Sequence, residues 1–171
     1  MRPVNRQDGG TRGLRPRALA LGALAALALA GCGYGFSQRY VAAGGVDRIH
    51  VRPFVNHSTE PELGATVTSA LRGELARRGA DATEGSAAVL DGEVRATEPV
   101  VTSTAGATWR IGIEVRARLV AGTAKPVDRI VRRDVDYLAG SDPLETEGRR
   151  ALALRRAADD VARDLLRALE R

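Results

Sequence analysis

The chain has 171 residues and a formal net charge of +5, from 26 Lys and Arg residues against 21 Asp and Glu residues. It contains one cysteine and two histidines, so the sequence offers neither an intramolecular disulfide nor a paired Cys and His ligand set of the kind that zinc sites use.

Residues 1–31 have the pattern of an export signal. Five arginines and a single acid, Asp8, precede an uncharged apolar block from Ala18 to Ala30. That block is shorter than the roughly 20 residues that a membrane-spanning helix needs, so it fits a signal peptide that is later removed.

The end of this block, Leu29-Ala30-Gly31-Cys32, resembles the lipobox of bacterial lipoproteins. In that family the cysteine sulfur carries a diacylglyceryl group and the signal is cut before the cysteine. The resemblance implies a covalent lipid on Cys32 and no other cofactor, and Gly33 in place of Asp implies the periplasmic face of the outer membrane. Two or more lipid chains make such an anchor stable. An ordinary signal followed by a buried cysteine is the alternative.

Removal of residues 1–31 leaves 21 basic and 20 acidic residues, a net charge of +1. The basic character therefore belongs largely to the signal, and binding to nucleic acid is not predicted. Residues 32–46 are rich in glycine and small residues and are predicted to form a lipidated linker. Residues 47–171 suffice for a single domain with its own core.

The segment "RIHVRPFVN" at residues 48–56 predicts the first β-strand. Alternation places Ile49, Val51 and Val55 on one face. Phe54 then lies on the other face, and Pro53 indicates a sheet edge or a bulge.

A helix is predicted to follow, with Thr59 and Glu62 as a capping box and Gly79 at its end. Its apolar positions recur every four residues, at Leu63, Val67, Leu71 and Leu75. An amphipathic helix of this kind needs a sheet to cover.

Three more strands are predicted, at residues 87–99, 109–122 and 127–140. The second of these alternates most clearly. Its apolar residues are Ile111, Ile113, Val115, Ala117 and Leu119. In the last strand Arg129 and Arg133 interrupt the alternation, which leaves a β-bulge open as the explanation.

A long amphipathic helix at residues 144–170 ends the chain. The order β-α-β-β-β-α, with one apolar face along the strands, predicts an α+β fold. We expect a two-layer sandwich of two helices packed on one face of a four-stranded mixed sheet, with the other face open to solvent.

The sequence contains no recognisable catalytic arrangement, so we predict that the protein is not an enzyme. His50 and His57 lack the spacing of a metal site, and no metal is predicted. A Cys–His nucleophile would need the thiol that the lipid occupies. Ser58 lacks the G-x-S-x-G pattern of a nucleophile elbow.

Arginines gather on the predicted open face, and guanidinium groups suit bidentate binding of phosphate. They are Arg52, Arg95, Arg110, Arg116, Arg118 and Arg132. Acidic residues lie among them, so a binding surface and a solvated, salt-bridged surface are both open interpretations. For Trp109, core packing and contact with a partner are likewise both open.

Three segments together resemble the LptE family, the lipoproteins of lipopolysaccharide assembly. They are "GCGYGF" at the lipidation site, "IHVRPFVNHSTEPELGATVTSALRGEL" at residues 49–75 and "AAVLDGEV" at residues 87–94. The strand and helix segment also resembles other periplasmic lipoproteins, including the cell-wall-synthase activator LpoB and the secretion lipoprotein CsgG. The Cys-Gly-Tyr start and the short chain favour LptE.

The resemblance implies two helices on a four-stranded sheet, a place inside the lumen of the outer-membrane β-barrel LptD, a role in assembling that barrel, and a role in moving lipopolysaccharide to the cell surface. From the strand geometry we expect Arg116 and Arg118 to be the lipopolysaccharide contacts, because residues two apart in a strand project from the same face. The alternative function is that of a regulatory lipoprotein that activates a cell-wall synthase.

Overall fold

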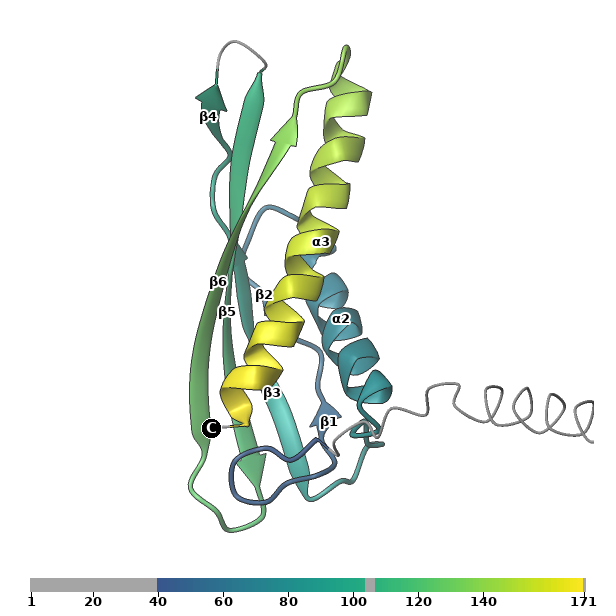
Figure 1. Ribbon diagram of the computed structural model, residues 1–171, viewed down its shortest axis with the longest axis vertical. Helices are drawn as coiled ribbons and strands as arrows, with labels where there is room; N and C mark the ends of the chain where they lie inside the picture. Colours follow the sequence, from purple (N-terminus) through teal and green to yellow (C-terminus); the bar gives the residue numbers. More distant parts are fainter. Residues whose placement is uncertain (1–39, 104–106, 171) are drawn as a thin grey trace, which may run out of the picture. The chain divides into compact units, whose positions relative to one another are not determined.

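The computed structural model describes residues 40–103 and 107–170. Two helices cover one face of a sheet whose other face is open, which confirms the predicted two-layer α+β arrangement (Figure 1). In chain order the elements are β1 (His50–Val51), β2 (Val55–Asn56), α2 (Leu63–Arg77), β3 (Ala88–Ala96), β4 (Val100–Ser103), β5 (Thr108–Ala121), β6 (Val127–Leu138) and α3 (Pro143–Leu169). Cys32 and the predicted signal lie outside the described residues.

The strands of the sheet lie in four rows. Both β1 and β2 pair in parallel with β3. β3 and β4 follow each other along one side of β5, antiparallel to it, and β6 lies antiparallel on the other side. Because two pairings are parallel and three are antiparallel, the sheet is mixed, as predicted.

One extra residue interrupts the first row at Pro53. Val51 is opposite Leu90 and Val55 is opposite Glu93, so four steps along this row match three steps along β3. The predicted bulge is therefore present, and it exchanges the two faces beyond it.

The exchange of faces corrects one prediction from the sequence. Phe54 turns inward and is 5% exposed, whereas Val55 turns outward and is 55% exposed. The ring of Phe54 packs over Gly92, where a Cβ atom would lie 2.7 Å from Phe54 Cε1 and 2.1 Å from the Arg116 carbonyl oxygen. Only glycine fits at this position.

The start of α2 differs from the prediction. Its N-cap residue is Glu62, which makes no side-chain capping bond. The prediction of a capping box formed by Thr59 and Glu62 is therefore wrong. Asn56 orders the preceding loop instead, because its Nδ2 donates to the Glu60 carbonyl (2.6 Å) and its Oδ1 accepts from the Ser58 N–H (3.1 Å). The predicted apolar stripe of α2 is buried throughout.

The arginines that interrupt the alternation in β6 have a different explanation from a bulge. β6 pairs with β5 without a register shift from Val127 to Leu138, so the bulge considered from the sequence is not there. Arg129 Nε donates to the Ala168 carbonyl (2.9 Å), and Arg133 forms an ion pair with Asp164. Both arginines lie at the edge of the sheet and reach past it to α3, where a cation near the C-terminal end of a helix is favourable.

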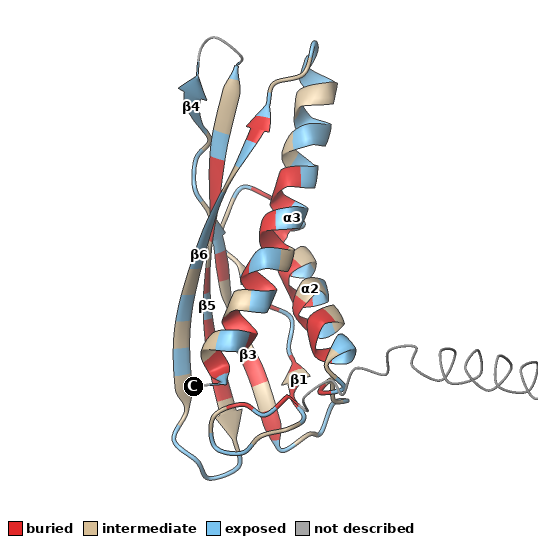
Figure 2. Ribbon diagram, viewed as in Figure 1, coloured by how far each residue is buried: buried red, intermediate tan, exposed pale blue. Residues whose placement is uncertain are grey.

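The core lies between the sheet and the helices, where buried residues on both layers face each other (Figure 2). Residues 40–46 of the predicted linker pack on it. The Tyr40 O–H donates to the Leu166 carbonyl (3.1 Å) and the Ala43 N–H donates to the Leu169 carbonyl (2.7 Å). Two hydrogen bonds therefore hold this segment against the last turn of α3. Burial raises the pKa of Tyr40. No helix in the described part of the chain is long and apolar enough to cross a membrane.

Candidate functional site

The open face of the sheet carries the residues that the sequence analysis singled out. In β5 the residues Val115, Ala117 and Leu119 are buried under the helices, while Arg116 and Arg118 are exposed on the opposite face. The structure therefore brings these two arginines together on one open surface, as strand geometry requires.

Arg116 is already engaged by neighbouring carboxylates. Its Nε lies 2.9 Å from Glu114 Oε1 and 3.8 Å from Glu93 Oε1. Glu114 also accepts a hydrogen bond from Arg132 of β6. The hydrogen bond from Arg116 is the largest effect that holds the pKa of Glu114 below its ordinary value, and the reciprocal bond raises the pKa of Arg116.

Arg118 is held more loosely. Register places it between Asp91 of β3 and Asp128 of β6, and its Nε lies 3.9 Å from Asp128 Oδ1. Asp91 is in turn 3.9 Å from Arg52 Nη1. Contacts of this length give little stabilisation in water, so Arg118 is free to turn toward another anion.

A bidentate ion pair of the open face lies toward the other end of β5. Arg110 donates to Asp136 through Nε (2.7 Å) and Nη2 (3.0 Å), a bidentate arrangement. The hydrogen bond from Arg110 is the main cause that lowers the pKa of Asp136.

Charges on the open face alternate in sign across neighbouring strands, as in the row of Asp91, Arg118 and Asp128. The acidic members are Asp91, Glu93, Glu114, Asp128, Asp134 and Asp136. They match the six arginines named from the sequence, Arg52, Arg95, Arg110, Arg116, Arg118 and Arg132. Because the signs balance, the face has no net attraction for a polyanion, and an anion can bind only where a guanidinium is loosely paired.

The two histidines have different neighbours. His57 Nε2 is 3.3 Å from Glu93 Oε2, and His50 Nδ1 is 3.2 Å from the Ala82 carbonyl. Among residues 40–103 and 107–170, no group of three or more His, Cys, Asp or Glu is placed to hold a metal ion.

Trp109 packs against the core but keeps part of its surface exposed. It lies between Val101 of β4 and Tyr137 of β6 in the register of the sheet. Core packing, one of the two interpretations from the sequence, is therefore confirmed.

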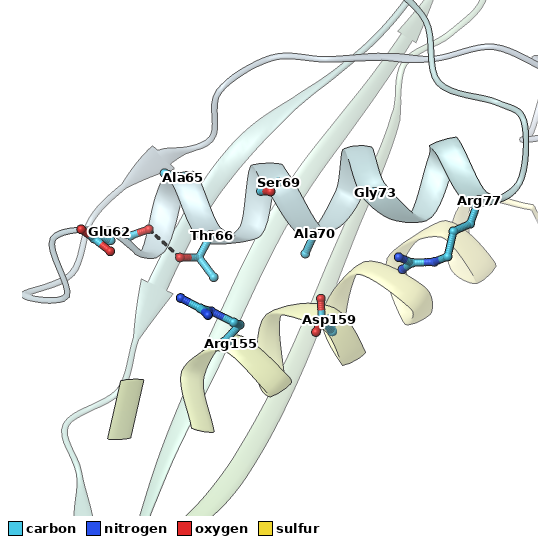
Figure 3. Close-up of a pocket in the computed structure, with 9 residues that line it drawn as sticks. All are labelled: Glu62, Ala65, Thr66, Ser69, Ala70, Gly73, Arg77, Arg155 and Asp159. Atoms are coloured by element: carbon cyan, nitrogen blue, oxygen red, sulfur yellow. Dashed lines mark hydrogen bonds between the residues drawn. The ribbon is translucent and has the colours of Figure 1, made fainter. Parts of the chain in front are cut away.

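A groove that sequence reasoning missed runs between the two helices. Its volume is about 620 Å³, and small side chains of α2 form much of its wall (Figure 3). Its charged lining residues are Glu62, Arg77, Arg155 and Asp159. The signal in the sequence is the small outer face of α2, with Ala65, Ser69 and Gly73 spaced by four.

A protein-family model described as "LptE: Lipopolysaccharide-assembly" matches residues 46–169 of the chain. No curated protein matches it. A putative lipoprotein from Caulobacter crescentus CB15 is similar in structure, with 19% identity, a TM-score of 0.53 and coverage of 69% of this chain and 88% of that chain.

Two further solved structures resemble the chain. A protein from Xanthomonas campestris has 12% identity and a TM-score of 0.50, over 70% of this chain and 81% of that chain. Rare lipoprotein B from Shewanella oneidensis has 12% identity and a TM-score of 0.49, over 67% and 91%. At such identities the similarity to the Caulobacter and Xanthomonas structures shows a shared fold.

Proposed function

Because the chain belongs to the LptE family of lipopolysaccharide-assembly proteins, we propose that it is the lipoprotein partner of a large outer-membrane β-barrel. Members of this family are lipoproteins of lipopolysaccharide assembly and are not enzymes. The family match covers nearly the whole described domain, and this one observation carries the proposal.

The partner in this proposal is the barrel LptD. The two-layer domain assists the assembly of the barrel, occupies its lumen and aids insertion of lipopolysaccharide at the outer membrane. The covalent lipid on Cys32 holds it at the periplasmic face of that membrane.

The length of the linker supports such a placement. Tyr40 is hydrogen-bonded to Leu166 of α3, so only residues 33–39 separate the lipidated cysteine from the domain. Seven residues span at most about 25 Å when fully extended. The domain therefore works close to the bilayer surface.

Lipopolysaccharide contact is assigned in this proposal to Arg116 and Arg118. Both guanidiniums are exposed and two residues apart, and Arg118 is loosely paired. Phosphate groups would replace the weak contact with Asp128 by charge-assisted hydrogen bonds, which are the stronger kind. Arg116 has to exchange part of its bond with Glu114.

Affinity purification from solubilised membranes tests the partner. We expect a large outer-membrane β-barrel to be recovered with the protein. Recovery of a cell-wall synthase in its place would contradict the proposal and favour the regulatory lipoprotein.

Two variants test the anchor. Cys32→Ser is expected to release the chain from membranes, because the acyl chains supply the binding free energy. Gly33→Asp keeps the lipid and is the matched control, which we expect to stay membrane-bound but to leave the outer-membrane fraction. Mass spectrometry that finds unmodified Cys32 in a soluble mature protein would overturn the anchor.

A further inference from the structure

The two outer edges of the sheet differ in how their backbone groups are used. The edge formed by β1 and β2 is closed by its own chain. The Arg72 guanidinium donates to the Val51 carbonyl (2.6 Å). The Phe54 N–H donates to Thr68 Oγ1 (2.9 Å), and Pro53 has no N–H to offer. Such an edge offers few free backbone donors and acceptors to another strand.

The opposite edge is β6, which is 12 residues long. Within the described residues, β5 is the only strand that pairs with it, so its outer side has no strand partner. At its beginning Arg129 Nη1 donates to the Asp128 carbonyl and charged side chains crowd the edge, which discourages indiscriminate pairing. Its last residues, 135–138, run beside α3 (Figure 1).

A groove of about 560 Å³ lies at this end of β6. One wall is the end of β6 together with Thr108 of β5, and the other wall is α3. Its apolar lining includes Leu138 and Leu152, each 52% exposed, together with Tyr137 and Ala153. Large apolar side chains this exposed are a common mark of an interaction surface when they line one groove.

The charge of the groove is positive. Arg149 and Arg156 line it from α3. Arg149 pairs with Glu145, and Asp136 is held by Arg110 as described above. In the described part of the chain Arg156 has neither a hydrogen bond nor an ion pair, so one cation at the groove is unmatched.

We propose that this groove takes an extended segment of a partner protein, which adds to the outer edge of β6 as a further strand. Apolar side chains of the segment lie on Leu138 and Leu152, and an acidic side chain meets Arg156. Strand addition supplies backbone hydrogen bonds, while the apolar wall and the cation supply selectivity. An acyl chain could not use the backbone donors and acceptors of β6, which is why a peptide fits better than a lipid.

The site is independent of Cys32 and of Arg116 and Arg118, so its test does not depend on the proposed function. The probe is a fluorescein-labelled hexapeptide of alternating valine and threonine with one glutamate, and the protein is the full chain purified in detergent. Fluorescence anisotropy measures affinity, and hydrogen exchange read by mass spectrometry locates the contact. We expect slower exchange at residues 130–138 and at residues 149–156.

Two matched controls separate strand addition from simple adhesion. The same peptide with N-methylated backbone amides keeps its side chains but loses its donors, and we expect it to bind at least about tenfold more weakly. Arg156→Glu is expected to weaken binding of the glutamate peptide by about tenfold and to strengthen binding of the same peptide with lysine in place of glutamate. Arg155→Glu, on the helix face toward α2, is expected to leave both unchanged (Figure 3).

Several results would overturn the proposal. These are equal binding of the N-methylated peptide, no change with Arg156→Glu, and protection outside β6 and α3. If phosphatidylglycerol vesicles protect residues 130–138 and the peptide does not, the groove holds a lipid. If sedimentation shows a dimer with residues 130–138 protected in the absence of peptide, the occupant is a second copy of the chain.

Discussion

The covered face and the open face of the sheet are built from the same strands but hold together in different ways. In β5, Ile113 and Val115 are fully buried under the helices, whereas the alternating residues Glu114 and Arg116 are paired with each other on the open face. Burial of apolar surface contributes about 25 cal/mol per Å², while exposed ion pairs contribute roughly 0–1 kcal/mol each. The covered face therefore determines stability, and the open face is free to serve recognition.

Phe54 and Val55 give the sharpest test of this difference, because they are neighbours on opposite faces. Phe54→Ala removes a buried ring from above Gly92 and should lower the free energy of unfolding by about 3–5 kcal/mol. Val55→Ala removes an exposed side chain, and we expect a change below about 1 kcal/mol. Denaturant unfolding of both variants measures the contrast.

Comparable losses for the two variants would mean that the face exchange at Pro53 does not occur in solution. The face assignment from simple alternation would then be restored.

A polar group on the covered face should give an intermediate effect. Thr68 Oγ1 accepts from the Phe54 N–H and donates to the Gly64 carbonyl (2.7 Å). Thr68→Val leaves that buried N–H without a partner and is expected to cost about 1–3 kcal/mol. Thermal unfolding measures this cost. The control is Thr66→Val, because the Thr66 hydroxyl donates only to the Glu62 carbonyl at the start of its own helix, and we expect a change of about 0.5 kcal/mol. Equal effects would show that the bond to Phe54 does not matter.

The smallest effect on stability is expected on the open face. The double variant Arg116→Gln, Arg118→Gln removes two exposed cations without setting new acids beside Glu93 and Glu114. We expect stability to change by less than about 1 kcal/mol. Lipopolysaccharide binding should nevertheless fall by about tenfold, because charge-assisted bonds to phosphate are lost.

Arg163→Gln on the outer side of α3 is the matched control for the double variant, since it also removes an exposed, ion-paired guanidinium. Lipopolysaccharide binding is measured for both by the same titration. If the double variant binds as well as the control, the open face is a solvated surface and these arginines are not contacts.

Much of the fold could be predicted because its strands alternate cleanly. β3 and β5 and the apolar stripe of α2 have the faces that alternation and helical spacing predict. The prediction failed beyond Pro53, because a single inserted residue exchanges the faces and its position depends on pairing with β3. It failed also for Arg129 and Arg133, whose partners lie in α3, far along the chain.

The candidate site was only half predictable. Alternation places Arg116 and Arg118 on the open face, but it says nothing about their neighbours. The register decides that Arg116 faces Glu93 and that Arg118 faces Asp91 and Asp128. Register arises from the whole sheet, so neither the balance of charges nor the loose pairing of Arg118 is visible in the sequence.

The hydrogen bond between Tyr40 and Leu166, in the last turn of α3, joins residues 126 positions apart. Synthesis runs from the N-terminus, so this contact cannot form until the 126 positions between Tyr40 and Leu166 have been made. Contacts of such long sequence separation also close slowly. We therefore expect residues 40–46 to dock only after α3 has formed, so that this segment joins the domain late in folding.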